Sequence, residues 1–325
     1  MITTINPATE EIIQQYQLHT TNEVNARLES LHHGWRQWKA LSFDERGKYL
    51  SVLGKKLLEK KEEYATLITR EMGKPIRAAC AEIEKCAWIC EYFAENAEKH
   101  LLPEVIQTSL KKSTIHYQPM GIILGIMPWN FPFWQVFRAM ATSMMAGNVF
   151  LLKHAPISTG ASLAIEALWA EIAPMTVFRS VILDEQQVSA LIGHNQIAGV
   201  TLTGSVRAGK SVAKYAAEAM KKYVLELGGS DPYIILSDAD VAAAAQVCVQ
   251  SRLANAGQVC IAPKRLIAVD SVYDSFRAHV LEKTQMYSCG NPLRDETVLG
   301  PMARADLRDL VVRHVKECIQ HGATV

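Results

Sequence analysis

The sequence carries almost no net charge and contains no long apolar run. Its 34 Lys and Arg residues balance 33 Asp and Glu residues, which gives a formal net charge of +1. A balanced chain has no bulk electric field that would attract nucleic acid or an anionic membrane surface. No apolar run approaches the ~20 residues that a membrane span requires. We therefore expect neither nucleic acid nor a membrane as a partner.

The N-terminal segment lacks the features of a secretory signal, and the cysteines lack the spacing of a metal site. Met1–Pro7 has no basic stretch followed by an apolar core. Seven Cys is an odd number, so at least one thiol has no partner within the chain. Cys80, Cys86 and Cys90 follow a helical spacing, without the paired CxxC or nearby His of a zinc site. These features favour buried free thiols, no metal and a reducing cytoplasm.

The chain also lacks internal repeats and low-complexity tracts, and its 325 residues are enough for two domains. Helical spacing dominates the first hundred residues, and from residue 113 short apolar runs alternate with helical segments. Such alternation predicts an α/β fold with a parallel sheet, which binds ligands beyond the carboxyl ends of its strands. A second α/β unit should begin after Gly228–Gly229. We expect strands at 113–118, 121–127, 149–153, 177–183 and 199–203, and helices at 133–145 and 161–170.

Two segments carry candidate reacting groups. Asn255–Cys260 places a cysteine just after a glycine-containing loop, where backbone N–H groups can lower the pKa of a thiol. Leu225–Gly229 places the carboxylate of Glu226 at the end of a strand, before two glycines. Each has a simpler interpretation when taken alone, because most such cysteines are small core residues and a Glu before glycines can belong to a capped turn.

Two further segments offer groups for binding. Met127–Pro132 holds Asn130 between prolines, which fix the direction of the backbone, and its amide is a suitable donor to an oxyanion. Lys153 stands at the carboxyl end of a strand, where its ammonium group can bond ribose hydroxyls. The simpler interpretations are a turn with an Asn cap and a surface lysine.

Gly204–Ser211 fits the G-x-x-x-x-G-K-[ST] pattern of a phosphate-binding loop. It follows an expected strand and opens an expected helix, as that motif requires. Apolar runs that end at Asp238 and Asp270 provide candidates for a metal-binding partner. A P-loop ATPase is therefore one alternative. A helix N-terminus with small residues can equally hold the pyrophosphate of a dinucleotide.

Taken together, these segments resemble the aldehyde dehydrogenase superfamily over the whole chain. The Pro-Trp-Asn-Phe-Pro segment of that family stands at Pro128–Pro132, its Glu-Leu-Gly-Gly at Glu226–Gly229 and its Gly-Gln-x-Cys at Gly257–Cys260. The order of the segments and the interval from Glu226 to Cys260 also match the family. Within it, Gln135–Arg138 and the run around the cysteine are most similar to bacterial NAD(P)-dependent succinate semialdehyde dehydrogenases.

The resemblance implies a two-step oxidation of an aldehyde substrate. Cys260 would attack the aldehyde, and Asn130 would stabilise the oxyanion with the backbone N–H of Cys260. Hydride would then pass to NAD or NADP, and Glu226 would activate water to release the acid. The residues implied in cofactor binding are Met127, Pro128, Trp129, Lys153, Gly204, Ser205, Gly209 and Leu227, which would make Lys210 incidental.

The resemblance also implies a site for the substrate. Arg138 would bind a substrate carboxylate bidentately, and Trp134 lies one turn earlier on the same helix face. A salt bridge is the alternative role for Arg138. The chain departs from its relatives at Ala254, where a well-known subgroup carries a second Arg, and at Pro156, where strict NAD enzymes carry a Glu. The usual glycine-rich turn is missing around Asp184–Glu185.

The same resemblance predicts the domain organisation. Residues 1–107 and 122–227 would form a Rossmann-like NAD(P)-binding domain, residues 108–121 part of an oligomerisation hairpin, and residues 228–325 a catalytic domain. Val325 falls inside that catalytic domain, so we expect a chain that is incomplete at its C-terminus and impaired in activity. The full-length protein would be a homodimer or homotetramer. A non-catalytic relative is a further alternative, although the presence of Cys260, Glu226 and Asn130 argues against it.

Overall fold

The computed structural model describes all 325 residues, which divide into two compact units. The first unit contains residues 1–3, 15–65 and 80–227, and the second contains residues 4–14, 66–79 and 228–325. None of the helices combines the length with the apolar composition that a membrane span needs.

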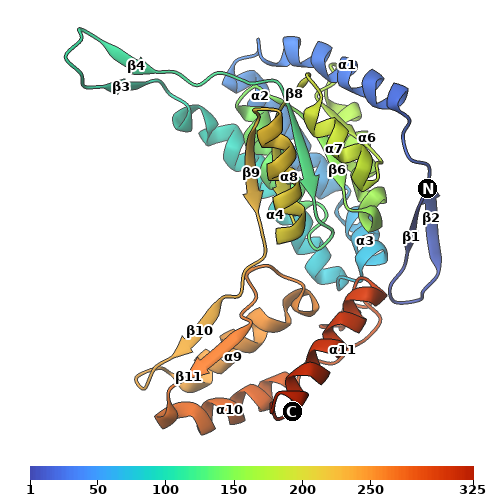
Figure 1. Cartoon of the computed structure of the whole chain (residues 1–325), viewed down its shortest axis with the longest axis vertical. Coiled ribbons are helices and arrows are strands. Elements are labelled where there is room, and N and C mark those ends of the chain that lie inside the picture. The colour runs from blue at the N-terminus through green and yellow to red at the C-terminus, as the bar shows by residue number, and fades with distance from the viewer. The chain divides into compact units, whose positions relative to one another are not determined.

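A five-stranded parallel sheet forms the centre of the first unit (Figure 1). The strand order β7-β6-β5-β8-β9 places the reversal of the chain between β5 and β8, where doubly wound sheets bind their ligands. The predicted α/β fold with a parallel sheet is confirmed. The strands are β5 (Ile122–Met127), β6 (Val149–His154), β7 (Phe178–Ser180), β8 (Ile197–Thr203) and β9 (Lys222–Glu226).

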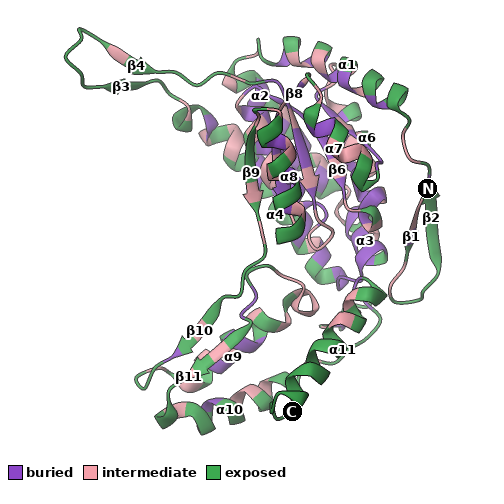
Figure 2. Ribbon diagram, viewed as in Figure 1, coloured by how far each residue is buried: buried purple, intermediate pink, exposed green.

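Apolar strands and amphipathic helices explain how this sheet is covered. The run Val149–Leu152 is fully buried, as expected of a central parallel strand with both faces covered (Figure 2). Helices α1 and α5 contact β5 and β6, whereas α7 and α8 pack against β8. The helices before and within the sheet are α1 (Thr21–Trp38), α2 (Phe43–Glu59), α3 (Lys61–Met72), α4 (Ile76–His100), α5 (Trp134–Met145), α6 (Thr159–Ile172), α7 (Glu185–Gly193) and α8 (Val206–Glu218).

An antiparallel hairpin projects from the first unit (Figure 1). It consists of β3 (Glu104–Ile106) and β4 (Ser113–Ile115), with Val105 opposite Thr114. The strand expected at 113–118 is therefore shorter and ends at Ile115. A hairpin without a third strand or a packing partner has little stability of its own. The role of residues 108–121 in oligomerisation stays a prediction.

The second unit is a smaller α/β arrangement. Strands β10 (Pro232–Ile235) and β11 (Arg265–Ala268) pair in parallel, and its core contains Ile235, Ala245, Cys248 and Phe276. Helix α11 has no buried residue, and Figure 2 shows most of its length exposed. The other elements are β1 (Ile2–Ile5) and β2 (Ile12–Tyr16), which pair with each other, and α9 (Val241–Leu253), η2 (Ala254–Gly257), α10 (Asp270–Thr284) and α11 (Ala305–Gln320).

The assignment of residues 1–107 to one domain is not what the contacts show. Residues 4–14 and 66–79 group with the second unit. The backbone N–H of Ile76 donates to the carbonyl of Pro292 at 2.8 Å. Gly300 packs so closely against Gly73 that a Cβ at Gly300 would collide with the carbonyl oxygen of Gly73. A local sequence pattern does not reveal such distant packing partners. The functional roles of the predicted domains stay predictions.

Candidate active and cofactor-binding sites

The segment that carries Asn130 joins the end of β5 to α5. The carbonyl of Met127 accepts a hydrogen bond from the N–H of Ala155 at 2.9 Å. His154 Nδ1 accepts from the same N–H at 2.8 Å, so the ring proton is on Nε2, which donates to the carbonyl of Pro132 at 2.8 Å. The end of β6 therefore holds this segment on both sides of Asn130, which is itself half-buried.

His154 is a neutral donor in this arrangement. Burial lowers its pKa to about 4, although the hydrogen bond to Pro132 opposes that shift. A charged imidazole would lose most of its hydration in this position. The ring therefore stays uncharged at neutral pH.

Glu82 of α4 provides a second anchor for the segment. Its Oε1 accepts hydrogen bonds from the N–H groups of Phe133 at 2.9 Å and Trp134 at 3.0 Å, and the residue is only 4% exposed. No local side chain caps α5, so Glu82 satisfies the N–H groups that the helix start leaves open. A carboxylate is also favoured there by the helix dipole. Glu82 carries no sequence signal for this role, because nothing local relates it to Phe133.

Arg138 of α5 contacts the residue predicted to be the general base. Its Nη1 lies 3.7 Å from Glu226 Oε2, and its Nη2 donates to Thr203 Oγ1 at 3.4 Å. The two charged side chains are 38% and 54% exposed. The alternative of a salt bridge for Arg138 is therefore present in the structure, with a partner on β9. Binding of a substrate carboxylate by Arg138 stays a prediction.

Trp134, the other predicted substrate residue, has a cationic neighbour. The ammonium group of Lys85 lies 4.0 Å from the centroid of the Trp134 ring. A cation over an indole face is attracted by the quadrupole of the ring. Lys85 comes from α4, three residues after Glu82, so the same helix contacts the start of α5 twice. No pattern in the sequence indicates this role of Lys85.

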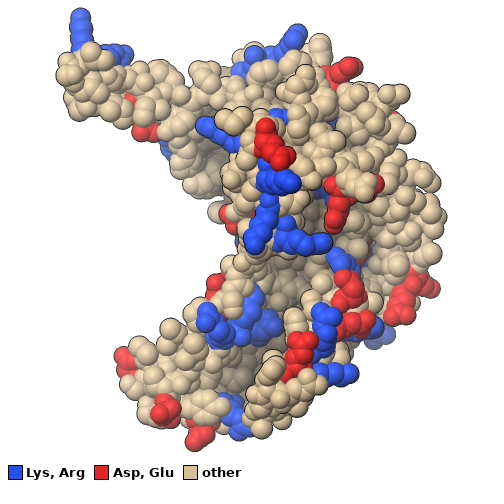
Figure 3. All heavy atoms as spheres, in the orientation of Figure 1, with Lys and Arg blue, Asp and Glu red and all other residues tan.

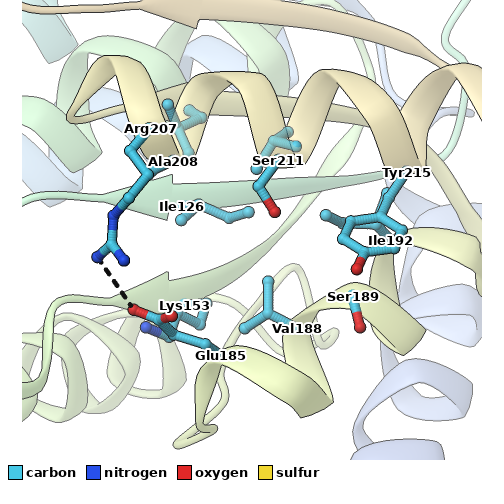
Figure 4. A pocket seen from close by; sticks show the side chains of 12 residues that line it. Ile126, Lys153, Glu185, Val188, Ser189, Ile192, Arg207, Ala208, Ser211 and Tyr215 are labelled. Atoms are coloured by element: carbon cyan, nitrogen blue, oxygen red, sulfur yellow. Dashed lines mark ion pairs between the residues drawn. The ribbon is translucent and has the colours of Figure 1, made fainter.

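A cavity of about 240 Å³ lies between α7 and α8, beyond the ends of β5, β6 and β8 (Figure 4). Burial lowers the pKa of Lys153, and the carboxylates of Glu185 and Asp184 oppose the shift. Apolar walls with a cationic end suit a purine attached to a phosphorylated sugar. The apolar residues are Ile126, Val188, Ile192, Leu202, Ala208 and Val212, and the polar ones are Lys153, Glu185, Ser189, Arg207, Ser211 and Tyr215.

The predicted phosphate-binding segment forms the start of α8. Ser205 caps the helix by accepting a hydrogen bond from the N–H of Ala208 at 3.2 Å, and the N–H of Gly204 donates to the carbonyl of Glu226 at 2.9 Å. Gly209 is buried against Leu227, since a Cβ there would lie 2.7 Å from Leu227 Cδ2. Gly209 thus allows a close approach of the chain that follows β9.

The alternative of a P-loop ATPase finds no support. Helix α8 already begins at Val206, so Gly209, Lys210 and Ser211 lie within the helix and not in a loop that could wrap a phosphate. Lys210 is exposed and does not line the cavity. The match to the phosphate-loop pattern is a feature of the sequence without the corresponding geometry.

Cys260 belongs to the second unit and follows an unusual turn. Asn255, Ala256 and Gly257 have φ values of 51°, 55° and 75°, so three successive residues are left-handed. Gly257 is required here, because a Cβ would also lie 2.8 Å from Arg252 Nη1 and 3.2 Å from the carbonyl oxygen of Arg252. Left-handed residues other than glycine cost about 1 kcal/mol or more and often mark functional loops.

Side chains on both sides hold the loop that carries Cys260. Gln258 Nε2 donates to the carbonyl of Asn255 at 3.1 Å, and Gln258 Oε1 accepts from the N–H of Ala303 at 3.0 Å. Lys264 Nζ donates to the carbonyl oxygens of Val259, at 3.1 Å, and Cys260. The thiol of Cys260 is exposed. The loop therefore presents the sulfur from a backbone that is fixed on both sides.

Comparisons with known proteins extend over the full length of the chain. The model of the aldehyde dehydrogenase family matches residues 1–325. A probable NADP⁺-dependent succinate-semialdehyde dehydrogenase of Synechocystis is 43% identical over 99% of this chain and 71% of its own length. The succinate semialdehyde dehydrogenase [NAD(P)⁺] Sad of Escherichia coli is 41% identical over 98% of this chain and 69% of its own. The crystal structure of succinic semialdehyde dehydrogenase from Streptococcus pyogenes with NADP⁺ has a TM-score of 0.96 at 34% identity, covering 99% of this chain and 71% of that one.

Proposed function

Because the chain belongs to the aldehyde dehydrogenase family, we propose that it oxidises succinate semialdehyde to the corresponding acid with NAD or NADP. The observation that carries this choice of substrate is Arg138, a half-buried cation on the helix that directly follows the Asn130 segment. A guanidinium has five N–H donors in a planar fork, so it can keep its contacts to Glu226 and Thr203 and still bind a carboxylate.

In the proposed reaction, Cys260 attacks the aldehyde carbon as a thiolate and forms a tetrahedral adduct. The side-chain amide of Asn130 donates a hydrogen bond to the oxyanion of that adduct. A nicotinamide held in the cofactor site would supply the acceptor for the hydride that leaves the former aldehyde carbon, and Cys260 would then hold the acyl group as a thioester. Glu226 then removes a proton from water, which attacks the thioester and releases the acid and free Cys260.

The cavity between α7 and α8 supports binding of the adenosine half of the cofactor. Its apolar walls would hold the adenine, and Lys153 at the end of β6 would donate to the ribose. Pro156, which follows β6, carries no carboxylate that could repel a 2′-phosphate. We therefore propose that both NAD and NADP are accepted, as the name of the Escherichia coli relative indicates for that enzyme.

Two wider properties belong to the same proposal. All seven cysteines are free thiols, which supports a reducing compartment, and we propose the cytoplasm. The hairpin β3–β4 exposes Val105, Leu110 and Ile115, and an open strand edge with apolar side chains is suited to pairing with another chain. We propose that this hairpin contributes to a homodimer or homotetramer.

The experiment that tests the proposal measures the absorbance of reduced nicotinamide after purified protein is mixed with succinate semialdehyde and either NAD or NADP. We expect reduction of both cofactors, and no reduction by Cys260→Ser. An uncharged aldehyde of similar length serves as the comparison substrate. Reduction with the uncharged aldehyde but not with succinate semialdehyde would reject the proposed substrate and retain the aldehyde dehydrogenase activity.

A further inference from the structure

An ion pair crosses the cavity between α7 and α8. Arg207 Nη2, from the first turn of α8, lies 3.9 Å from Glu185 Oε1, from the first turn of α7 (Figure 4). Both residues line the cavity together with Lys153, which comes from the end of β6 between the two helices. Figure 4 shows Glu185 and Lys153 on the same side of the cavity, and the charge of Glu185 acts on the Lys153 ammonium group. Three charged groups from three elements therefore meet at one end of the proposed adenosine site.

We infer that Arg207 and Glu185 together discriminate between a 2′-phosphate and a 2′-hydroxyl on the adenosine ribose. Arg207 binds a 2′-phosphate, and the carboxylate of Glu185 repels it. The inference rests on the proposed cofactor site, in which Lys153 holds the ribose. A carboxylate on the ribose side of a dinucleotide site favours a 2′-hydroxyl, and a neighbouring arginine accommodates a 2′-phosphate. Here both groups are present and bind to each other.

The charges explain why the pair can separate when a phosphate arrives. The side chains of Arg207 and Glu185 are 88% and 89% exposed, so water screens their attraction and the pair is weak. A phosphate monoester carries up to two negative charges and three acceptor oxygens, which match the fork of a guanidinium better than a single carboxylate at 3.9 Å does. Arg207 can therefore exchange Glu185 for a phosphate, while Glu185 keeps its electrostatic contact with Lys153.

Glu185 also changes what Pro156 implies. The position after β6 lacks a carboxylate, but Glu185 places one at the same cavity from a different helix. Asp184 is less available, since its side chain accepts a hydrogen bond from the N–H of Gln187 at 2.9 Å and caps α7. The preference between the two cofactors is therefore set by the balance between Arg207 and Glu185.

Helix α8 provides a matched control for Arg207. Figure 3 shows basic side chains gathered over this helix, which carries Arg207, Lys210 and Lys214. Of these, only Arg207 lines the cavity. Lys210 is also exposed and carries the same charge, so Lys210→Ala removes one positive charge from the same helix without changing the cavity lining. A general effect of positive charge on α8 would appear in both variants.

The test is a calorimetric titration of the full chain with 2′,5′-ADP and with 5′-AMP, at one fixed ionic strength. Arg207→Ala should weaken binding of 2′,5′-ADP about tenfold, the effect of one charged hydrogen bond, and leave 5′-AMP unchanged. Glu185→Gln should tighten binding of 2′,5′-ADP and should not tighten binding of 5′-AMP, because the lost carboxylate opposes a 2′-phosphate and favours a 2′-hydroxyl. Lys210→Ala should change neither ligand by more than about twofold.

The double variant distinguishes a direct contact from an indirect one. If Arg207 binds the phosphate, Arg207→Ala should still weaken binding of 2′,5′-ADP when it is combined with Glu185→Gln. Disappearance of the effect there would mean that Arg207 acts only by neutralising Glu185, and would overturn the inference. Equal weakening of both nucleotides by Arg207→Ala would also overturn it. A wild-type chain that binds neither nucleotide would reject the proposed cofactor site itself and the inference with it.

Discussion

The guanidinium of Arg138 lies 3.7 Å from the carboxylate of Glu226, so the predicted substrate residue and the predicted general base form one ion pair. The pair connects α5 to the end of β9, and Thr203 at the end of β8 receives a hydrogen bond from the same guanidinium. Two residues that are far apart in the sequence thus share one electrostatic environment. A change at either of them should affect both substrate binding and the release of product.

Replacement of Arg138 should separate charged from uncharged substrates. We expect Arg138→Leu to raise KM for succinate semialdehyde much more than KM for an uncharged aldehyde of similar length. A buried charge pair would be worth ~2–5 kcal/mol, but the 38% exposure of Arg138 reduces this to about 1–2 kcal/mol. Loss of the partner of Glu226 should in addition alter kcat for both substrates. Steady-state kinetics with the two aldehydes measure both effects. Equal rises in the two KM values would show that Arg138 is only structural.

Replacement of Glu226 should separate the two chemical steps. In Glu226→Gln, hydride transfer precedes the attack of water, so we expect a burst of reduced cofactor followed by slow turnover. Stopped-flow absorbance after mixing enzyme, cofactor and aldehyde reports both phases. Cys260→Ser is the control, and it should show neither phase. If Glu226→Gln loses the burst and the slow phase to the same extent, Glu226 is not the base for deacylation.

The buried His154 should make stability depend on pH. Its pKa is lowered by burial to about 4, below the usual 6.5, so the unfolded chain binds more protons than the folded chain between these values. The free energy of unfolding should therefore be highest above pH 6.5 and fall as the pH decreases toward 4. The full effect of this shift would be on the order of 3 kcal/mol.

A variant without a titrating ring isolates this effect. His154→Gln keeps an N–H donor for the carbonyl of Pro132 but does not titrate in this range. Urea unfolding at pH 7.5, 6, 5 and 4.5 should give a steeper loss of stability for the wild type than for His154→Gln. Identical pH profiles in the two proteins would mean that His154 is not the group responsible.

The strands and the ends of strands were predictable because their signals are local. The run Val149–Leu152 is apolar throughout, which indicates a strand with two covered faces, and the structure has β6 there. Glu226 stands one residue before the pair Gly228–Gly229 and does end β9. The same logic placed Lys153 and Asn130 near the carboxyl edge of the sheet, because a parallel sheet brings the ends of all its strands to one side.

The contacts that complete the site were not predictable, because each joins residues without a local relationship. Glu82 caps α5 from another helix, and Arg207 meets Glu185 across a cavity. The match of Gly204–Ser211 to a phosphate loop failed for a related reason, since the pattern does not say where α8 begins. The left-handed conformation of Ala256 has no sequence signal either, because alanine disfavours it.

Glu82 should stabilise the fold through the start of α5. Glu82→Ala leaves the N–H groups of Phe133 and Trp134 without their acceptor, which should cost about 1–3 kcal/mol of unfolding free energy. Glu82→Gln retains an acceptor oxygen and loses only the charge, so its cost should be smaller. Urea unfolding of the two variants gives the comparison. Equal stability of Glu82→Ala and the wild type would show that the two hydrogen bonds do not hold the helix start.

Two neighbouring substitutions in the turn before Cys260 should have different effects on stability. In Gly257→Ala, a Cβ would enter a left-handed residue and approach the carbonyl oxygen of Arg252 to 3.2 Å, so we expect a loss of about 1 kcal/mol or more. Ala256→Gly removes the strain of a left-handed alanine and should leave stability unchanged or increase it. The alkylation rate of Cys260, followed by peptide mass spectrometry, reports the loop itself and should change in Gly257→Ala and not in Ala256→Gly. If both variants alkylate at the wild-type rate, the left-handed turn does not position the thiol.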